Sequence, residues 1–492
     1  MHHIAPLAKS KNDIVTQVEM ENAEELGLLK MDFLGLKTLD LIKNTIRFVH
    51  NRNDLDQYDF IPTTDNIWDI PLDNEEVYKN IFQQSDTNGV FQCESHLFKK
   101  LLKKMKPKRF EHIIAILALG RPGTLEAGIV DDYIDRMHDK QEVEYPHPDL
   151  KEELKETYGF MVYQEQVIKA SQIIAGFSLG KGDILRRAMG KKKEKLMKKL
   201  KKEFIEGAKE NGHTEEFAEE IFSLIEYFSG YGFNKSHSAA YAMIAYATAW
   251  LKNYFPAEFY ASLMTLESEK TPKDSKLKSY ITDCYHKDIE ILSPHINRSE
   301  KGFTADNGVI RFGLGSIKGV GDKAVEDILN KRPFDSLKDM YDRVRRRVVN
   351  KTVFEAMIKS GALNCFSEDR KKLMEQYYEL RDDNLEVEGE MSKREVIKYE
   401  TETLGLSVTH PSKWDMMEKG EKIKFVGKLK DVAEITTKND NLMAFAQLVT
   451  PRQEIKMVIF PSQYRKNKSI LKDGQKVLVM GEKGTDNSLV MY

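Results

Sequence analysis

The sequence contains little cysteine, little tryptophan and no long apolar run. Among its 492 residues there are 3 Cys and 3 Trp. Cys93, Cys284 and Cys365 are too widely spaced for a zinc-binding pattern or a disulfide framework. No apolar run is long enough to span a membrane, and residues 1–7 lack the features of a signal peptide. These absences favour a cytoplasmic protein that does not enter a membrane.

Charge of one sign is not in excess either. The formal net charge is -2 and 41% of the residues are hydrophobic. Bulk charge therefore does not indicate a nucleic-acid-binding protein, whereas the apolar content is sufficient for folded cores. A chain of this length is typical of three or four domains. Its basic residues gather locally, at residues 99–109, 186–202 and 343–347, and such patches are typical of contacts with phosphate.

The most informative motif is YGFNKSHSAAY at residues 231–241, which leads into a predicted apolar helix over residues 239–251. It combines the amine of Lys235 with the hydroxyl of Ser236 and the imidazole of His237. The start of a helix presents free N–H groups and the positive end of the helix dipole, and both attract phosphate. A serine-capped helix with a surface lysine explains the same residues equally well.

A second basic motif, DILRRAMGKKK, occupies residues 183–193 and continues as a lysine run to Lys202. The run beyond Lys195 is typical of a solvated helix face. Arg186 and Arg187 differ from it, because apolar residues precede them and Ala-Met-Gly follows. We therefore expect at least one guanidinium group to project from a packed element, where its planar shape suits a di- or triphosphate.

With these two motifs, the chain resembles the C-terminal half of the bacterial replicative DNA polymerase III alpha subunit. Six segments follow the order of that family: residues 27–36, 87–92, 121–123, 158–166, 186–187 and 231–241. The resemblance implies a DNA-directed DNA polymerase, which transfers nucleotides to a primer 3′ end as the template directs. Its substrates are then primer–template DNA and deoxynucleoside triphosphates. The resemblance also implies that the triphosphate contacts Arg121, Arg186, Arg187, Lys235, Ser236 and His237.

The segment GLLKMDFLGL at residues 27–36 holds a lysine and a carboxylate among apolar residues. Lys30 and Asp32 alternate with bulky apolar residues, so a strand would place both on one face. A salt bridge explains the pair from the residues alone, although a carboxylate in apolar surroundings can also hold a cation. The resemblance implies that Asp32 is the third of three palm aspartates that bind Mg²⁺, and that Lys30 lies near the incoming triphosphate.

The other two aspartates of that family form an Asp-x-Asp pair that should precede Asp32, and residues 1–31 contain no such pair. Two-metal phosphoryl transfer needs several carboxylates. We therefore expect the chain alone to be inactive and to need the N-terminal half of the polymerase as a partner. Asp131, Asp132 and Asp135 offer a rival metal site, but an exposed helix face with basic neighbours explains them better.

A helix-hairpin-helix element is predicted over residues 317–329, IKGVGDKAVEDIL. Gly319 and Gly321 allow a tight turn whose backbone N–H groups can approach a DNA phosphate without reading the base sequence. Lys318 and Lys323 flank this turn and complete the expected DNA-binding site. Many helical hairpins use such a glycine pair, but its position after the polymerase-like motifs favours DNA binding.

A partner hairpin and a charged connection follow. Residues 350–362 are predicted to form the second hairpin of a tandem pair, and residues 367–399 one helix followed by a linker. The resemblance implies a sliding-clamp-binding motif in this neighbourhood, with a glutamine and a leucine-phenylalanine pair, but no clean copy is present. Binding of the sliding clamp therefore rests on the resemblance alone.

From residue 422 onward the apolar period changes to two. Strands are predicted at residues 423–427, 442–448, 455–460, 477–480 and 489–492, with a helical segment after Pro461. This pattern predicts a small oligonucleotide-binding (OB) barrel. Phe425, Phe445 and Tyr464 are candidate platforms for bases, although their alternation with aliphatic residues assigns them more readily to the core.

The predicted fold class is α+β with several domains. A small palm remnant at residues 1–45 precedes mostly helical fingers at 46–292, a helix-hairpin-helix and clamp-binding region at 293–415, and an OB-fold domain at 416–492. Two other functions fit parts of the sequence: a noncatalytic DNA-binding protein derived from this polymerase, and an NAD-dependent DNA ligase. The ligase fits poorly because its adenylated lysine lies in Lys-x-Asp-Gly, whereas residues 472–474 read Lys-Asp-Gly.

Overall fold

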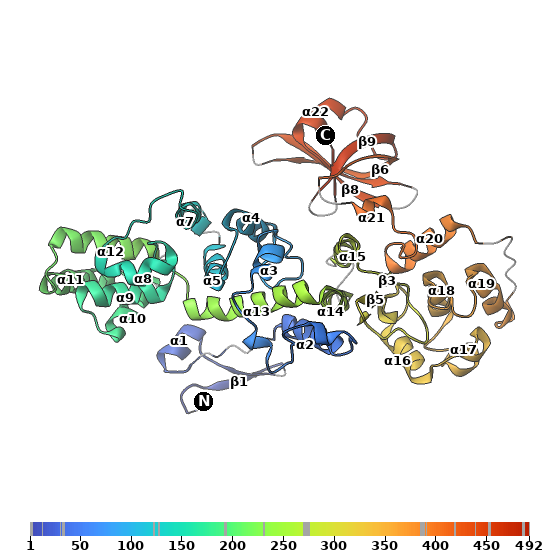
Figure 1. The fold of residues 1–492 in the computed structure, drawn as a ribbon, viewed down its shortest axis with the longest axis horizontal. Coiled ribbons are helices and arrows are strands. Elements are labelled where there is room, and N and C mark those ends of the chain that lie inside the picture. The colour runs from blue at the N-terminus through green and yellow to red at the C-terminus, as the bar shows by residue number, and fades with distance from the viewer. Residues whose placement is uncertain are drawn as a thin grey trace. The chain divides into compact units, whose positions relative to one another are not determined.

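The computed structural model describes most of the chain. The described residues are 3–11, 13–29, 31, 35–121, 124–125, 128–190, 194–229, 232–268, 276–383, 389, 391–417, 420–437, 439–450, 454–484 and 488–491. They divide between two compact units, Met1–Asp40 and Leu41–Tyr492. The predicted mixed α+β class is confirmed, with extensive helical regions followed by a closed β-barrel (Figure 1).

The first unit contains a β-hairpin and a short helix. β1 (Leu7–Ser10) pairs antiparallel with β2 (Asp13–Thr16), and α1 (Met20–Glu25) follows. The strand considered around Lys30 and Asp32 is not formed at Leu29 and Met31, whose side chains are exposed. Apolar alternation makes a strand only where a sheet buries the apolar face. Lys30 and Asp32 themselves lie outside the described residues.

The helix α13 (Lys235–Tyr254) packs against many elements of residues 41–268. Its buried residues include Ala242, Ala245 and Ala249, and it packs against α5 (Phe110–Leu119), where the Ser238 hydroxyl donates to the carbonyl of Ile114 at 2.7 Å. α5 is apolar on nearly all sides and is therefore buried. The other elements of this part are α2 (Lys37–Val49), η1 (Leu55–Gln57), η2 (Ile67–Asp69), α3 (Glu75–Val77), η3 (Tyr78–Phe82), α4 (His96–Met105), α7 (Ile129–Met137) and α14 (Pro256–Ser268).

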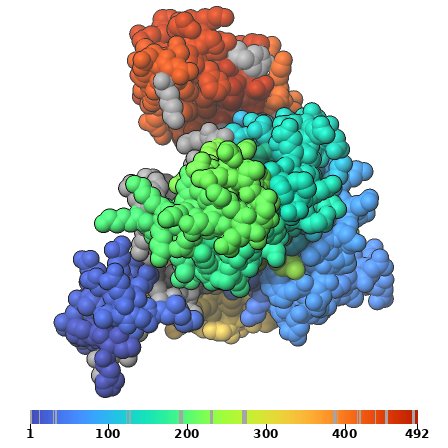
Figure 2. All heavy atoms as spheres, turned by 90° about the vertical axis from the view of Figure 1, so that its left-hand side faces the viewer, coloured from blue at the N-terminus to red at the C-terminus, as the bar shows by residue number. Residues whose placement is uncertain are grey.

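A helical bundle is inserted between α7 and α13. Its elements are η4 (Pro148–Leu150), α8 (Lys151–Leu154), η5 (Lys155–Thr157), α9 (Gln164–Ala175), α10 (Leu179–Gly190), α11 (Glu194–Glu210) and α12 (Glu215–Ser229). α11 buries Leu200 and Phe204, while Lys195 and Lys198 are exposed. The lysine run beyond Lys195 is therefore mainly a solvated face, as predicted. Figure 2 looks onto α11 and α12 from the end of the bundle.

A small sheet and a second group of helices follow. The sheet has the order β3-β5-β4. The prediction of one helix and a linker over residues 367–399 is wrong at its end, because a second helix begins at Lys393. Ser392 and Glu395 form a capping box for that helix. The elements are α15 (Leu277–His286), β3 (Ile291–Leu292), β4 (Thr304–Asp306), β5 (Val309–Arg311), η6 (Leu314–Ser316), α16 (Asp322–Lys331), α17 (Leu337–Arg343), α18 (Lys351–Ser360), α19 (Arg370–Glu379), α20 (Lys393–Leu404) and α21 (Lys413–Met416).

The predicted five strands form a closed barrel in the order β10-β8-β7-β6-β9. β10 runs parallel to β8, and the other pairs are antiparallel. Tyr464 is buried and Phe425 packs against the barrel core, so these two rings are core residues. The elements are β6 (Lys422–Thr436), β7 (Leu442–Val449), β8 (Glu454–Ile459), α22 (Pro461–Asn467), β9 (Lys476–Lys483) and β10 (Leu489–Met491).

Among the described residues, no helix combines the length and the apolar character needed to cross a membrane. Cys93, Cys284 and Cys365 are all free thiols, and the first two are buried.

Candidate functional site

The start of α13 is already occupied by a carboxylate of the protein itself, that of Glu165. Asn234 is the N-cap, and its side-chain oxygen accepts a hydrogen bond from the backbone N–H of His237 at 2.7 Å. The backbone N–H of Lys235 donates to both carboxylate oxygens of Glu165, at 3.0 and 3.2 Å. The expectation of free N–H groups is thus wrong for these two amides, because an N-cap side chain and a carboxylate are favourable at a helix start.

The amine of Lys235 is held by a second carboxylate. Its Nζ lies 2.6 Å from Oε2 of Glu156 and 5.3 Å from the ring centroid of Tyr163. The other oxygen of Glu156 and the hydroxyl of Tyr163 are buried without a hydrogen-bond partner in the described structure. Burial raises the pKa of Tyr163 well above its usual range. Within the described residues, Glu156 and Tyr163 thus each leave one buried oxygen without a hydrogen bond near Lys235.

The arginine pair lies on α10, one turn after an aspartate. Nε and one terminal nitrogen of Arg186 lie 2.9 and 2.8 Å from Oδ1 of Asp183. Arg187 reaches the other oxygen at 2.7 Å. The hydrogen bond from Arg186 lowers the pKa of Asp183. The side chain of Arg186 is 28% exposed and that of Arg187 is 68% exposed, so Arg186 is the guanidinium that projects from a packed element.

Gln164 joins the arginine pair to the start of α13. Its side-chain oxygen accepts from Arg186 at 3.0 Å, and its side-chain nitrogen donates to the carbonyl of Gly232 at 3.3 Å. The backbones of the two segments also bond, with the N–H of Gln164 donating to the carbonyl of Phe233 at 2.9 Å. Arg186 and Lys235 are thereby brought together from positions 49 residues apart in the sequence.

Phe233 is the ring around which the other predicted residues gather. The guanidinium of Arg121 stacks 4.4 Å from its centroid, and burial lowers the pKa of Arg121. The ring of His237 lies 5.4 Å from Phe233 and 4.4 Å from Tyr241. Ser236 is exposed beside them. Such packed aromatic rings near fixed cations can receive a flat base together with a phosphate chain.

Sequence reasoning missed the partners of these cations. Asp183 lies three residues before Arg186, so the (i, i+3) spacing could have revealed that pair. Glu156 and Glu165 belong to another segment, and local spacing contains no signal for their contacts with Lys235. Gln164 and Glu165 fall inside the motif at residues 158–166, but the motif by itself predicts no role for either side chain.

The rival metal site does not form. Asp131 pairs with Lys104 at 2.8 Å and Asp135 with Lys140 at 3.3 Å, as expected of an exposed helix face. Among the residues that the structure describes, no group of three or more His, Cys, Asp or Glu side chains could hold a metal ion.

The predicted hairpin turn presents an open surface. Gly319 has φ +96°, a left-handed conformation that favours glycine, and Gly321 directly precedes α16. Lys318, Gly319, Gly321 and Lys323 are all exposed. In this part of the described chain, the backbone N–H groups of Gly321 and Lys323 donate to no protein acceptor. These groups can therefore bind an external anion without losing an internal bond.

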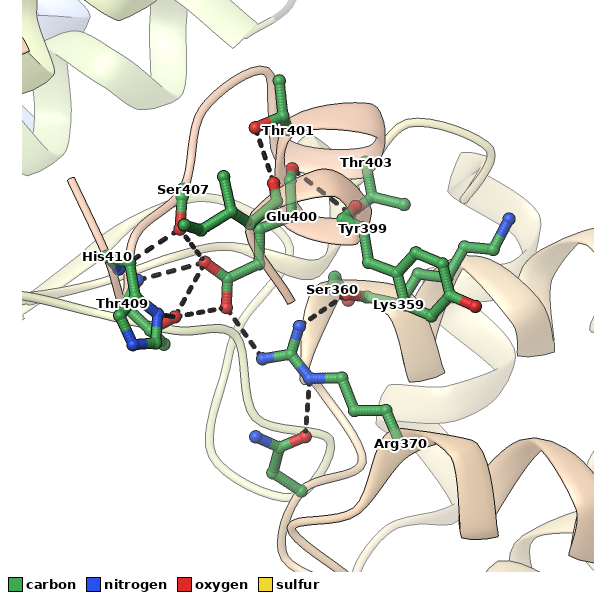
Figure 3. A network of polar contacts seen from close by, with 12 residues as sticks. Lys359, Ser360, Arg370, Tyr399, Glu400, Thr401, Thr403, Ser407, Thr409 and His410 are labelled. Atoms are coloured by element: carbon green, nitrogen blue, oxygen red, sulfur yellow. Dashed lines mark hydrogen bonds and ion pairs between the residues drawn. The ribbon is translucent and has the colours of Figure 1, made fainter. Parts of the chain in front are cut away.

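A buried ion pair between Arg370 and Glu400 joins helices that follow this hairpin in the chain (Figure 3). Glu400 is fully buried and accepts hydrogen bonds from Arg370 at 2.7 Å, Ser407 at 2.7 Å and the Thr409 hydroxyl at 2.8 Å. Arg370 also donates to the carbonyl of Lys359 at 2.7 Å. The pair thus joins α18, α19, α20 and the turn that follows α20.

α20 in turn contacts the hairpin directly. The carbonyl of Thr403, in the last turn of α20, accepts a hydrogen bond from the backbone N–H of Lys318 at 2.8 Å. A carbonyl at a helix C-terminus has no partner within its own helix. The amide of Lys318 fills this place and is not available to DNA, in contrast to the amides of Gly321 and Lys323.

The segment 350–362, predicted as a second hairpin, holds a single helix, α18, which follows α17 in the chain. Asn350 caps α18 and accepts from the N–H of Val353 at 3.2 Å. The buried carboxylate of Asp327 accepts from the backbone N–H and Nε of Arg345, at 2.8 and 2.6 Å. Burial would raise the pKa of Asp327, but these bonds and one from Lys331 outweigh it and lower the pKa.

Two family models match the chain. The bacterial DNA polymerase III alpha subunit finger domain matches residues 38–212, and the helix-hairpin-helix motif matches residues 288–373. The first range contains Arg121, Arg186 and Arg187, and the second contains the hairpin turn.

The curated relatives agree with these models. DNA polymerase III subunit alpha of Aquifex aeolicus is 39% identical over 514 residues, which cover 98% of this chain and 43% of the relative. The subunits of Pseudomonas aeruginosa and Escherichia coli K12 are 46% and 42% identical, over 71% and 73% of this chain and 30% and 31% of their own lengths. The chain therefore spans less than half the length of the curated relatives it matches.

Proposed function

Because the chain belongs to the bacterial DNA polymerase III alpha subunit family, we propose that it forms the nucleotide- and DNA-holding part of a DNA-directed DNA polymerase. The observation that carries this proposal is that Arg121 stacks on Phe233 and that Arg186 binds Gln164, which in turn bonds Gly232, three residues before Lys235. Three cations from three separate segments meet beside a helix start, an arrangement that suits a triphosphate.

The incoming deoxynucleoside triphosphate binds by exchange of anions. Asp183 holds Arg186 and Arg187, and Glu156 holds Lys235. A triphosphate offers oxygens of greater total charge and displaces these carboxylates, while Gln164 keeps Arg186 oriented. His237 and Tyr241 lie beside Phe233 and contact the sugar and base. Ser236 is exposed at the first turn of α13 and supplies a hydroxyl to the phosphates.

The catalytic metal site is shared with the rest of the polymerase. Polymerases of this kind use Mg²⁺ to stabilise the charge that develops on the phosphoryl group. The described residues do not fit a complete magnesium site, since none of their acidic clusters could hold a metal ion. Asp32 and Lys30 lie outside the described residues, and we assign them, from the family pattern, to one metal ligand and a phosphate contact. The remaining carboxylates come from the N-terminal half of the subunit.

The hairpin and the barrel bind primer–template DNA. The free amides after Gly319, with Lys318 and Lys323, contact backbone phosphates without reading sequence. The order of strands in the barrel, with a helix between β8 and β9, agrees with an OB fold. The sliding clamp is a further partner expected of the complete subunit, which acts in the cytoplasm.

A reconstituted primer-extension assay tests this function. The chain is combined with a separately expressed N-terminal half, Mg²⁺ and deoxynucleotides. We expect synthesis that Asp32→Asn abolishes, because asparagine lacks the charge of a cation ligand. A noncatalytic DNA-binding protein would bind the duplex but would not support synthesis with any N-terminal half. Robust extension by the chain alone would contradict the shared metal site.

A further inference from the structure

The outer face of β6 and β9 in the barrel departs from the usual pattern of a solvated sheet. Along β6, Leu429 points into the core, and alternate residues from Lys422 to Lys430 are exposed. Along β9, Val479 is buried, while Lys476, Leu478 and Met480 are exposed. The outward positions of an antiparallel sheet are normally polar. Apolar residues among them therefore call for an explanation.

Three exposed apolar side chains lie together on this face. Val426 is 51% exposed, Leu478 64% and Met480 40%. Val426 is directly opposite Leu478 in the register of β6 and β9, and Lys424 is opposite Met480. Residues opposite and diagonal to each other on one face lie within side-chain reach. The three residues thus form a continuous apolar cluster on an exposed surface, which is typical of an interaction site.

Lysines border the cluster. Lys428 lies directly opposite Lys476, and Lys424 lies opposite Met480. None of the ion pairs found among the described residues involves Lys424, Lys428 or Lys476, although the face also carries Glu482, opposite Lys422. Two like charges placed opposite each other destabilise a sheet. Carboxylates brought by a partner would relieve this repulsion, so the charge of the face selects an acidic partner.

The geometry also restricts the form of the partner. β6 is paired with β7 and β9, and β9 with β6 and β10, so neither strand offers a free edge for an added strand. The face carries aliphatic side chains and no aromatic ring on which a base could stack. A helix with an apolar stripe flanked by carboxylates matches an aliphatic cluster flanked by lysines.

We propose that the outer face of β6 and β9, made by Lys424, Val426, Lys428, Lys476, Leu478 and Met480, docks an acidic amphipathic helix of a partner protein. This surface shares no residue with the nucleotide site or with the hairpin. Leu478 and Val426 fill the apolar stripe of the helix, and the lysines pair with carboxylates on its two sides.

The test uses the full chain and a synthetic helical peptide with leucines on one face and glutamates on the other. A peptide of the same composition in scrambled order is the control probe. We expect the amphipathic peptide to bind about tenfold or more tightly than the scrambled one, in a salt-dependent manner, and to protect β6 and β9 from hydrogen exchange. Equal binding of the two peptides, or no binding of either, overturns the proposal.

Two variants and two matched controls locate the site. Val426→Ser with Leu478→Ser removes the apolar contacts, and Lys428→Glu with Lys476→Glu reverses the charge. Each is expected to weaken peptide binding about tenfold or more. Ile435→Ser with Leu442→Ser removes exposed apolar residues elsewhere on the barrel, and Lys466→Glu reverses a charge on α22; both should leave binding unchanged. Circular dichroism verifies that every variant is folded.

A parallel measurement with nucleic acid tests whether this face binds single-stranded DNA instead of a helix. Oligo-dT is added to the same proteins. We expect it neither to compete with the peptide nor to lose affinity in the Val426→Ser and Leu478→Ser variant. Competition by oligo-dT, with a parallel loss in both site variants, would identify a nucleic-acid surface and overturn the proposal. Equal losses in the site variants and the control variants would overturn it as well.

Discussion

The nucleotide site and the hairpin turn differ in whether their charged and donor groups already have partners. Around α13, Arg186, Arg187 and Lys235 are each held by a carboxylate at 2.6 to 2.8 Å. At the hairpin, the amides of Gly321 and Lys323 have no acceptor in the described structure. A site that orients one small ligand keeps its cations fixed before the ligand arrives. A site that follows a polymer of phosphates needs only an open, rigid surface.

Next to the hairpin, a buried ion pair fixes α20, whose Thr403 carbonyl accepts from the Lys318 amide. Arg370 and Glu400 are 2% and 0% exposed, whereas the pairs around α13 are partly exposed. Exchange of partners is easy at the surface and costly in the interior. An arginine–carboxylate ion pair can therefore be exchanged for a ligand in the first region, whereas in the second it is a structural contact that stays formed.

The largest expected effect follows from removing the buried ion pair of Arg370 and Glu400. Glu400→Ala removes the acceptor of Arg370, Ser407 and Thr409, and leaves a buried guanidinium without its partner. We expect a loss of about 3–5 kcal/mol in the stability of this region, measured by hydrogen exchange of α18, α19 and α20. Glu402→Ala, an exposed neighbour on α20, should change exchange little. Equal protection of α18, α19 and α20 in both variants would show that the network does not stabilise these helices.

The next effect concerns the fixed cations. Arg186→Ala and Lys235→Ala should each raise the KM for deoxynucleotides in the reconstituted enzyme, because each loses a charge-assisted bond of about 1.5–3 kcal/mol. Arg187→Ala should raise it less, since that side chain is more exposed. The affinity for duplex DNA should stay nearly constant. Lys198→Ala, on the solvated face of α11, is the control. If the three variants show the same KM for deoxynucleotides as this control, Arg186, Arg187 and Lys235 do not belong to the nucleotide site.

A smaller effect is expected when the open surface is obstructed. A β-carbon at Gly321 would meet no protein atom within 4 Å, so Gly321→Val leaves the fold intact and places a side chain before the free amides. We expect about a fivefold loss of affinity for duplex DNA, equivalent to one phosphate contact of about 1 kcal/mol. Wild-type affinity should fall as salt rises, through counterion release.

Gly319→Val is the companion change at the same turn. It combines obstruction with strain, because φ is +96° there. Gly212→Val, at φ +88° with open space around it, controls for strain alone. DNA affinity that resists both hairpin changes and is indifferent to salt would make the hairpin a structural spacer.

The smallest expected effect is a titration. The hydrogen bond from Arg186 lowers the pKa of Asp183, so this pair stabilises the fold above the usual aspartate pKa. That contribution is lost as the pH falls through the lowered pKa. Carboxyl NMR should place the Asp183 transition below the usual range, and Arg186→Ala should return it upward. If the Asp183 transition does not move in Arg186→Ala, the two side chains do not form an ion pair in solution.

Much of the fold could be read from local patterns. The five barrel strands follow a period of two, and α13 begins close to the polar segment that precedes its apolar run. The helix α20 was missed because its apolar residues are few, and its burial depends on Glu400, a residue type that is rarely buried. The many charged residues of this segment predicted a linker. The carboxylate of Glu400 is nevertheless buried, because it pairs with Arg370, thirty residues away.

The sequence by itself determined the kinds of side chain and their local spacing: a basic segment before a helix, a glycine pair in a turn, and alternating strands. Only the tertiary structure decided which charges are paired. Lys235 meets Glu156 from 79 residues away, and the Lys318 amide meets the carbonyl of Thr403. The physical reason is that periodicity is a property of the local backbone, whereas an ion pair depends on distances that exist only once the chain has packed.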